Sequence, residues 1–89
     1  MAPTDTLTLY HFESCPFCAR VRGAMARMGL DLPLRDVQRD RGSLEELVSA
    51  TGQRTVPCLR IEDTPGDVQW MHESADIIDY LDRRFSAAS

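Results

Sequence analysis

Two cysteines separated by two residues, in the run Cys15-Pro16-Phe17-Cys18, constrain this chain more than any other feature. Residues 7–12 before the pair are rich in β-forming side chains and predict a first strand. From Phe17 onward, apolar residues recur at helical spacing, and Gly29 is the expected end of the helix. The pair therefore lies in a turn that leaves a strand and enters a helix.

This placement suits thiol–disulfide chemistry. Pro16 fits the first turn of a helix, where a missing N–H breaks no helical hydrogen bond. The N-terminus of a helix favours negative charge and so stabilises the Cys15 thiolate, the form of cysteine that attacks a disulfide. Cys18 lies one turn further on, close enough to resolve the mixed disulfide that such an attack produces. The motif therefore predicts that Cys15 is the nucleophile and Cys18 the resolving thiol.

A zinc site is the main alternative for the cysteine pair. A structural zinc ion needs four ligands, which usually come from two close pairs. The further cysteine and histidine residues are Cys58, His11 and His72, and they form no second close pair. The sequence therefore favours thiol chemistry without a metal, and we interpret Cys58 as a small buried core residue.

The composition narrows the class of protein. With 89 residues, we expect a single domain over residues 1–89. The net charge of −4 argues against a nucleic-acid partner, and no apolar run approaches the roughly 20 residues of a membrane span. Residues 1–6 lack the pattern of a secretory signal, and three cysteines suit a disulfide-stapled extracellular scaffold poorly. We therefore expect a cytoplasmic protein with no membrane partner.

The rest of the chain predicts an α/β fold. Ser43 and Ser74 are the expected N-caps of two further helices, the first with Glu46 in a capping box and an end at Gly52. The turn at residues 64–67 predicts a hairpin. Further strands are expected at residues 32–37, 56–61 and 68–71. The order βαβ, α, ββα gives a four-stranded mixed sheet with helices on both faces, the thioredoxin-like architecture.

Pro57, near the start of the third strand, has two explanations. It can be an edge-strand residue, because proline cannot donate to a sheet ladder. Alternatively the Val56–Pro57 bond is cis, which an X-Pro bond adopts at modest cost. A cis bond would turn the backbone groups of Val56 outward, where they can pair with an extended peptide-like ligand.

Three segments of the sequence resemble the glutaredoxin family. They are Cys15-Pro16-Phe17-Cys18 after the first strand, Thr55-Val56-Pro57 before the third, and Glu73-Ser74-Ala75-Asp76 at the start of the last helix. The resemblance is greatest to the subgroup whose domain is shared with the N-terminal half of glutathione transferases. It extends from Leu7 to Phe85, and the three segments occur in the right order and at the right separations.

This resemblance implies a role for each matching residue. Cys15 matches the nucleophile of the family and Cys18 its resolving thiol, whereas the backbone of Val56, beside cis-Pro57, matches the partner of the cysteinyl part of glutathione. The remaining matches are to the two ends of glutathione: Glu73 and Ser74 for the γ-glutamyl end, and Arg54 for the glycine carboxylate. A solvated loop arginine is an equal alternative for Arg54. The chain departs from the family at Phe12, where many members have lysine, and at Phe17, where tyrosine is common.

The resemblance implies a glutathione-dependent thiol–disulfide oxidoreductase that reduces protein disulfides or glutathione mixed disulfides. Glutathione is then the reducing cosubstrate, no metal is needed, and we expect a monomer. Two alternatives stay open. Some glutaredoxins carry a [2Fe–2S] cluster held by glutathione and Cys15-type thiols, although a proline at position 16 disfavours this. A glutathione transferase-like domain is the other, but these 89 residues include no counterpart of the helical second domain that transferases use.

Overall fold

The computed structural model describes residues 6–86, so the segment considered above as a secretory signal lies, apart from Thr6, outside the described residues. The strands are β1 (Leu7–His11), β2 (Leu34–Asp36), β3 (Cys58–Thr64) and β4 (Asp67–Met71); the helices are α1 (Pro16–Met28), α2 (Arg41–Thr51) and α3 (Ser74–Leu81), with a π-helical segment, η1 (Asp82–Ser86), after α3. Within this part of the chain, no helix is long and apolar enough to cross a membrane.

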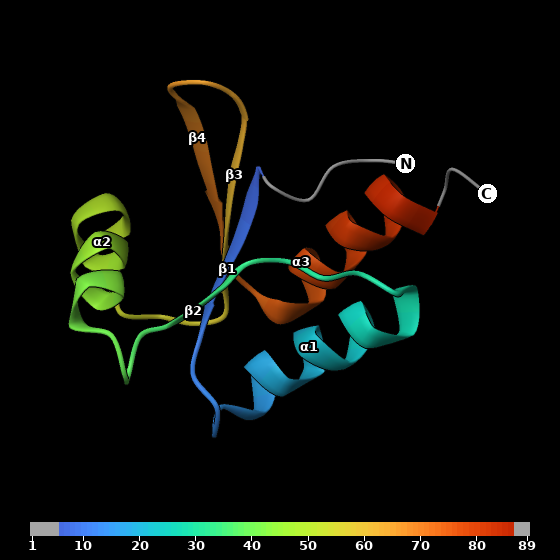
Figure 1. The fold of residues 1–89 in the computed structure, drawn as a ribbon, viewed down its shortest axis with the longest axis horizontal. Helices are drawn as coiled ribbons and strands as arrows, with labels where there is room; N and C mark the ends of the chain where they lie inside the picture. Colours follow the sequence, from blue (N-terminus) through green and yellow to red (C-terminus); the bar gives the residue numbers. More distant parts are fainter. Residues whose placement is uncertain (1–5, 87–89) are drawn as a thin grey trace.

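The strands form one mixed sheet in the order β2-β1-β3-β4. β1 pairs with β2 in parallel and with β3 antiparallel, and β3 and β4 form the predicted antiparallel hairpin. Helices α1 and α3 lie together on one face of the sheet, whereas α2 lies on the other (Figure 1). The predicted fold class, with helices on both faces, is confirmed.

Alternation along the two central strands divides the core between these faces, because successive side chains of a strand point to opposite sides. Leu7 and Leu9 of β1 pack toward α1 and α3, whereas Tyr10 faces α2. β3 repeats the pattern: Leu59 packs with the first group and Cys58 with the second. Each helix layer is therefore held to the sheet by its own apolar cluster.

Helix α1 begins and ends as the sequence predicts. Cys15 is its N-cap with an extended backbone, and Pro16 occupies the first helical position. At the other end, Gly29 has φ of 70°, and its N–H donates to the carbonyl oxygens of Ala26 and Met25. The first cap fixes where Cys15 stands, at the positive end of the helix.

Helix α2 starts earlier than predicted. Its N-cap is Asp40 rather than Ser43, because the Asp40 carboxylate accepts hydrogen bonds from the N–H of Gly42 at 3.2 Å and from the hydroxyl of Ser43 at 2.6 Å. Ser43 is fully buried inside the helix and supports the cap instead of forming it. The predicted end at Gly52, with φ of 73°, is confirmed.

The strand bounds also differ from the prediction. β2 covers three residues, Leu34–Asp36, rather than 32–37, and Leu34 is 47% exposed at this edge strand while Leu32 is buried before it. β3 begins only at Cys58, since Pro57 cannot donate to the ladder.

A matched pair of leucines tests this division between core and edge. Leu9 and Leu34 are register partners across β1 and β2, but Leu9 is fully buried. We expect Leu9→Ala to lower the free energy of unfolding by about 2–5 kcal/mol, because it opens a cavity in the core. Leu34→Ala should change it by about 0.5 kcal/mol or less. Equal losses in urea titrations of the two variants would contradict this assignment.

Candidate functional site

The two cysteines of the motif stand at the N-terminus of α1, where they differ in access. The Cys15 sulfur accepts a hydrogen bond from the N–H of Cys18 at 3.5 Å, which is the capping contact of the helix. Cys15 retains 7% of its surface, whereas Cys18 retains none. Cys15 is therefore the less buried of the two, and the order in which the thiols react stays a prediction.

The buried thiol of Cys18 holds its proton firmly. Burial raises the pKa of Cys18 to about 12, and a hydrogen bond with Cys15 acts in the same direction. A hydrogen bond with the backbone of Phe12 and the positive charge of Arg22 oppose this rise. Cys18 is thus a neutral thiol in the reduced protein and must lose its proton before it can act as a nucleophile.

A cleft of about 360 Å³ opens beside the cysteine motif. One wall consists of Phe17 and Arg20 from α1. The opposite walls come from the segment before β3 and from the start of α3, and include four of the predicted site residues: Val56, Pro57, Glu73 and Ser74. Three segments that are distant in the sequence thus meet in one cleft.

The Val56–Pro57 peptide bond is cis, the second of the two explanations considered for Pro57. Pro57 is buried, whereas Val56 is half-buried and lines the cleft. The backbone immediately before β3 is therefore presented at the cleft rather than used within the sheet, whose pairing with β1 begins at Cys58.

The start of α3 has an unusual backbone. Glu73 has φ of 73° and ψ of 115°, a region that residues other than glycine rarely adopt. Glu73, and not Ser74 as predicted, is the N-cap, because its carbonyl oxygen accepts the N–H of Ile77 at 3.0 Å. No side chain caps this helix, and Glu73 and Ser74 at its start line the cleft.

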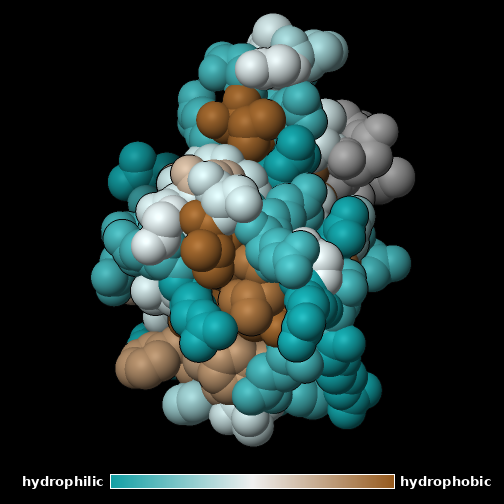
Figure 2. Space-filling model, turned by 90° about the vertical axis from the view of Figure 1, so that its left-hand side faces the viewer, coloured by the Kyte–Doolittle hydropathy of each residue, from teal (hydrophilic) through white to brown (hydrophobic). Residues whose placement is uncertain are grey.

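Arg54 lies apart from this cleft. It is exposed and lines a second hollow, of about 320 Å³, with Phe12, Val37, Gln38 and Leu44. Those apolar residues belong to the cluster between the sheet and α2, and on this side of the molecule hydrophobic residues reach the surface between polar ones (Figure 2). The structure thus gathers four of the five predicted glutathione contacts in one cleft and places the fifth in a neighbouring hollow.

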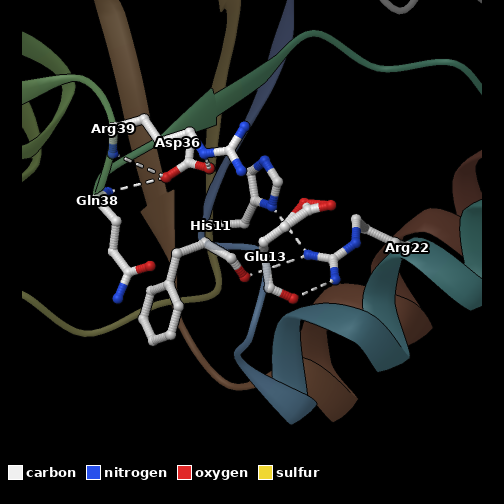
Figure 3. Close-up of polar contacts among 7 residues, drawn as sticks. His11, Glu13, Arg22, Asp36, Gln38 and Arg39 are labelled. Atoms are coloured by element: carbon white, nitrogen blue, oxygen red, sulfur yellow. Dashed lines mark hydrogen bonds and ion pairs between the residues drawn. The ribbon is translucent and has the colours of Figure 1, made fainter.

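Arg22 and His11 are residues that the motifs did not single out. The sequence predicts that Arg22 points away from the apolar face of its helix, yet the side chain is half-buried and turned back toward the end of β1 (Figure 3). It donates to the carbonyl oxygen of Glu13 at 3.0 Å and lies 2.9 Å from Nδ1 of His11. The spacing of four residues from Cys18 was the one available signal, since it puts both on one side of α1.

The third cysteine is part of the core. Cys58 is fully buried among Tyr10, Val37 and Leu47, as predicted, and burial raises the pKa of its thiol to about 12. His72 is half-buried with Nε2 at 3.9 Å from the Cys58 sulfur. Among residues 6–86, no three His, Cys, Asp or Glu side chains are grouped so as to hold a metal ion.

Comparison with known proteins fits this arrangement of thiols and cleft. The model of the family described as "Glutathione S-transferase, N-terminal domain" matches residues 9–89. This chain belongs to that family. The family match includes the cysteine motif, the cis-proline segment and the start of α3, so all the described walls of the cleft lie within it.

Several relatives of this family member are named glutaredoxins. Glutaredoxin-C4 of Oryza sativa subsp. japonica is 35% identical over 74 residues, which cover 75% of this chain and 56% of the rice protein. Glutaredoxin 2 of Escherichia coli (strain K12) is 29% identical over 77 residues, which cover 86% of this chain and 33% of that protein. The chain therefore spans between one third and somewhat more than half of these relatives.

Solved structures of the family show the same fold. Glutaredoxin 2 from Salmonella typhimurium, in complex with glutathione, has a TM-score of 0.70 and 28% identity, covering 88% of this chain and 33% of that one. A trimeric glutathione transferase from Leishmania gives a TM-score of 0.74 at 28% identity, covering 92% of this chain and 18% of that one. The thioredoxin-like fold of these proteins is thus shared across both groups.

The contact between Arg22 and His11 predicts a pH dependence of stability. Burial lowers the pKa of His11, and the charge of Arg22 lowers it further, against smaller opposing effects of Asp36 and Glu13. The unfolded chain therefore binds a proton near pH 6.5 before the folded one does. Stability is fully present above that pH and is lost as the pH falls through the lowered value of the folded state.

We expect the free energy of unfolding to decrease between about pH 6.5 and pH 5, above the range in which carboxylates titrate. His11→Asn, which cannot titrate but keeps an acceptor for Arg22, should flatten this part of the curve. Urea titrations at a series of pH values measure both. An unchanged slope in the variant would assign the dependence to another group.

Proposed function

We propose that this domain is a glutathione-dependent dithiol oxidoreductase, with Cys15 as nucleophile and Cys18 as resolving thiol. The observation that carries the proposal is the juxtaposition of Cys15, at the N-terminus of α1, with a cleft lined by Val56 and by the start of α3, which no side chain caps. The cleft can take an extended tripeptide, and its neighbour is a sulfur that can exchange with a thiol of that tripeptide.

The walls of the cleft match the chemistry of glutathione. The α-amino acid end of its γ-glutamyl group carries both charges: the carboxylate suits the uncapped N–H groups of α3 and the Ser74 hydroxyl, and the ammonium suits the Glu73 carboxylate. The backbone of Val56 can pair with the cysteinyl residue. The glutathione sulfur would then point toward Cys15, and Arg54 would receive the glycine carboxylate only from a ligand that extends toward the second hollow.

The reaction follows from the unequal thiols. The Cys15 thiolate attacks one sulfur of a protein disulfide, and the other sulfur leaves as a thiolate. Cys18 then loses its proton and attacks the Cys15 sulfur, which forms the Cys15–Cys18 disulfide and releases the second substrate thiolate. Two glutathione molecules reduce this pair in succession and leave as glutathione disulfide. With a glutathione mixed disulfide as substrate, external glutathione can replace Cys18.

The relatives support this proposal at the level of the ligand. Glutaredoxin 2 of Salmonella typhimurium was solved in complex with glutathione, and a maleylacetoacetate isomerase of the same fold, at 29% identity and a TM-score of 0.67, with dicarboxyethyl glutathione. A transferase function is the second candidate, because the family model is that of the transferase N-terminal domain. Reduction of a disulfide at the expense of glutathione, without conjugation of an electrophile, separates the two.

The proposed roles of the two cysteines predict that replacing each one has a different effect on activity. Cys15→Ser should abolish disulfide exchange, since it removes the attacking sulfur. Cys18→Ser should retain activity on a glutathione mixed disulfide and lose most activity on a protein disulfide. A coupled assay with glutathione measures both substrates. Survival of Cys15→Ser together with loss of Cys18→Ser would show that the roles are reversed.

The proposed glutathione contacts predict a change in the thiol requirement. Charge-assisted hydrogen bonds are worth roughly 1.5–3 kcal/mol, so Glu73→Gln or Ser74→Ala should raise the glutathione concentration needed by about tenfold. Turnover with a non-peptide thiol should hardly change. Glu45→Gln, an exposed carboxylate on α2, is the matched control. Equal losses with both thiols would indicate damage to the start of α3 rather than loss of a binding site.

A further inference from the structure

We propose that Arg22 is a positioning residue for both thiols: it fixes the turn that carries Cys15 and directs a positive charge toward the side of α1 that carries Cys18. The inference deepens the proposed function, on which it rests for the dithiol reaction. Arg22 does not line the cleft, so it acts through the groups it holds.

The guanidinium of Arg22 contacts three consecutive residues before the motif and so connects them to α1. Its Nη2 donates to the carbonyl oxygen of Glu13 at 3.0 Å, and its Nη1 donates to that of Phe12 at 3.4 Å. Nη1 also lies 2.9 Å from Nδ1 of His11. Because arginine can only donate, this nitrogen is an acceptor, and His11 is the neutral form protonated at Nε2. These contacts converge from β1 and the following turn (Figure 3).

Phe12 connects the hydrogen bonds of Arg22 to both cysteines. Its carbonyl oxygen accepts the N–H of Cys15 at 3.2 Å in addition to the bond from Arg22. Its backbone also forms the hydrogen bond that favours the thiolate of Cys18. Loss of the Arg22 side chain would therefore loosen a backbone segment that contacts both cysteines.

The charge of Arg22 is available to the resolving thiol. The partners of its guanidinium are two carbonyl oxygens and a neutral imidazole, none of which carries a negative charge. Two carboxylates lie near these contacts. Glu13, in the turn, acts electrostatically on His11. Asp36, on β2, accepts hydrogen bonds from the N–H groups of Gln38 and Arg39. The charge of Arg22 favours the thiolate of Cys18, the group that must lose a proton before it attacks the Cys15 sulfur.

Reaction with Ellman's reagent separates the two steps without glutathione. The Cys15 thiolate attacks the reagent disulfide and releases one thionitrobenzoate, leaving a mixed disulfide on Cys15. Cys18 then attacks the Cys15 sulfur, which forms the Cys15–Cys18 bond and releases the second thionitrobenzoate. Stopped-flow absorbance gives both rates. Cys18→Ser should release one equivalent only, because Cys58 is fully buried.

The variants are Arg22→Met, Arg22→Lys and, as matched control, Arg27→Met, which removes an exposed arginine from the same helix. We expect Arg22→Met to slow the second step about tenfold at pH 7, as a change of one pKa unit would. In both proteins the second step should become about tenfold faster per pH unit, because only a small fraction of Cys18 is ionised well below its pKa of about 12. Arg22→Lys, which keeps the charge, should recover most of the rate, and Arg27→Met should match the parent.

Three results would overturn the inference. One is a second step in Arg22→Met as fast as in the parent. Another is a second step that does not accelerate as the pH rises, which would mean that ionisation of Cys18 does not limit it, and the third is Arg22→Lys as slow as Arg22→Met. Release of a single equivalent by the parent protein would overturn this inference together with the dithiol mechanism, whereas the first three results would leave that mechanism intact.

Discussion

The central position of β1 is the constraint on which the rest of the structure depends. It is hydrogen-bonded on both sides, to β2 in parallel and to β3 antiparallel, so its alternating side chains must satisfy two separate cores. Leu7 and Leu9 anchor α1 and α3, and Tyr10 anchors the α2 side, where it packs on Trp70 with ring centroids 5.3 Å apart. A shift of one residue along this strand would exchange the two faces.

β1 also leads directly into the candidate site. After His11 the backbone leaves the sheet, turns through Phe12 to Ser14 and enters α1 at Cys15. The cleft forms where this helix start meets the start of α3 and the segment before β3. Such places have backbone groups that regular structure leaves unpaired, which is why a binding cleft arises there. Glu73, whose φ is positive, lines the same cleft.

The two motif cysteines show how burial divides their chemistry. Cys15 and Cys18 are three positions apart, and Cys15 retains 7% of its surface whereas Cys18 is fully buried and keeps its proton. In the proposed dithiol mechanism, the buried thiol of Cys18 must ionise before the second step. The positive charge of Arg22, held by backbone carbonyls and a neutral His11, favours this ionisation.

The sequence by itself determined the elements and the reactive motif, because these depend on local periodicity and on residues close together in the chain. The helical spacing after Phe17, the end of α1 at Gly29 and the hairpin at residues 64–67 required no long-range information. The cap of α2 was not determined in this way: Ser43 was predicted, but Asp40 is the N-cap and Ser43 is buried inside the helix. The resemblance to a known family also indicated four residues that share the cleft.

Only the tertiary structure decided which distant residues meet. It placed Arg54 in a separate hollow although Arg54 lies only three positions before Pro57, and it turned Arg22 from a polar helix face toward β1. It also left Leu34 exposed, because β2 is an edge strand whose neighbours cover little of it. Each outcome depends on packing between elements far apart in sequence, which no local pattern of residues encodes.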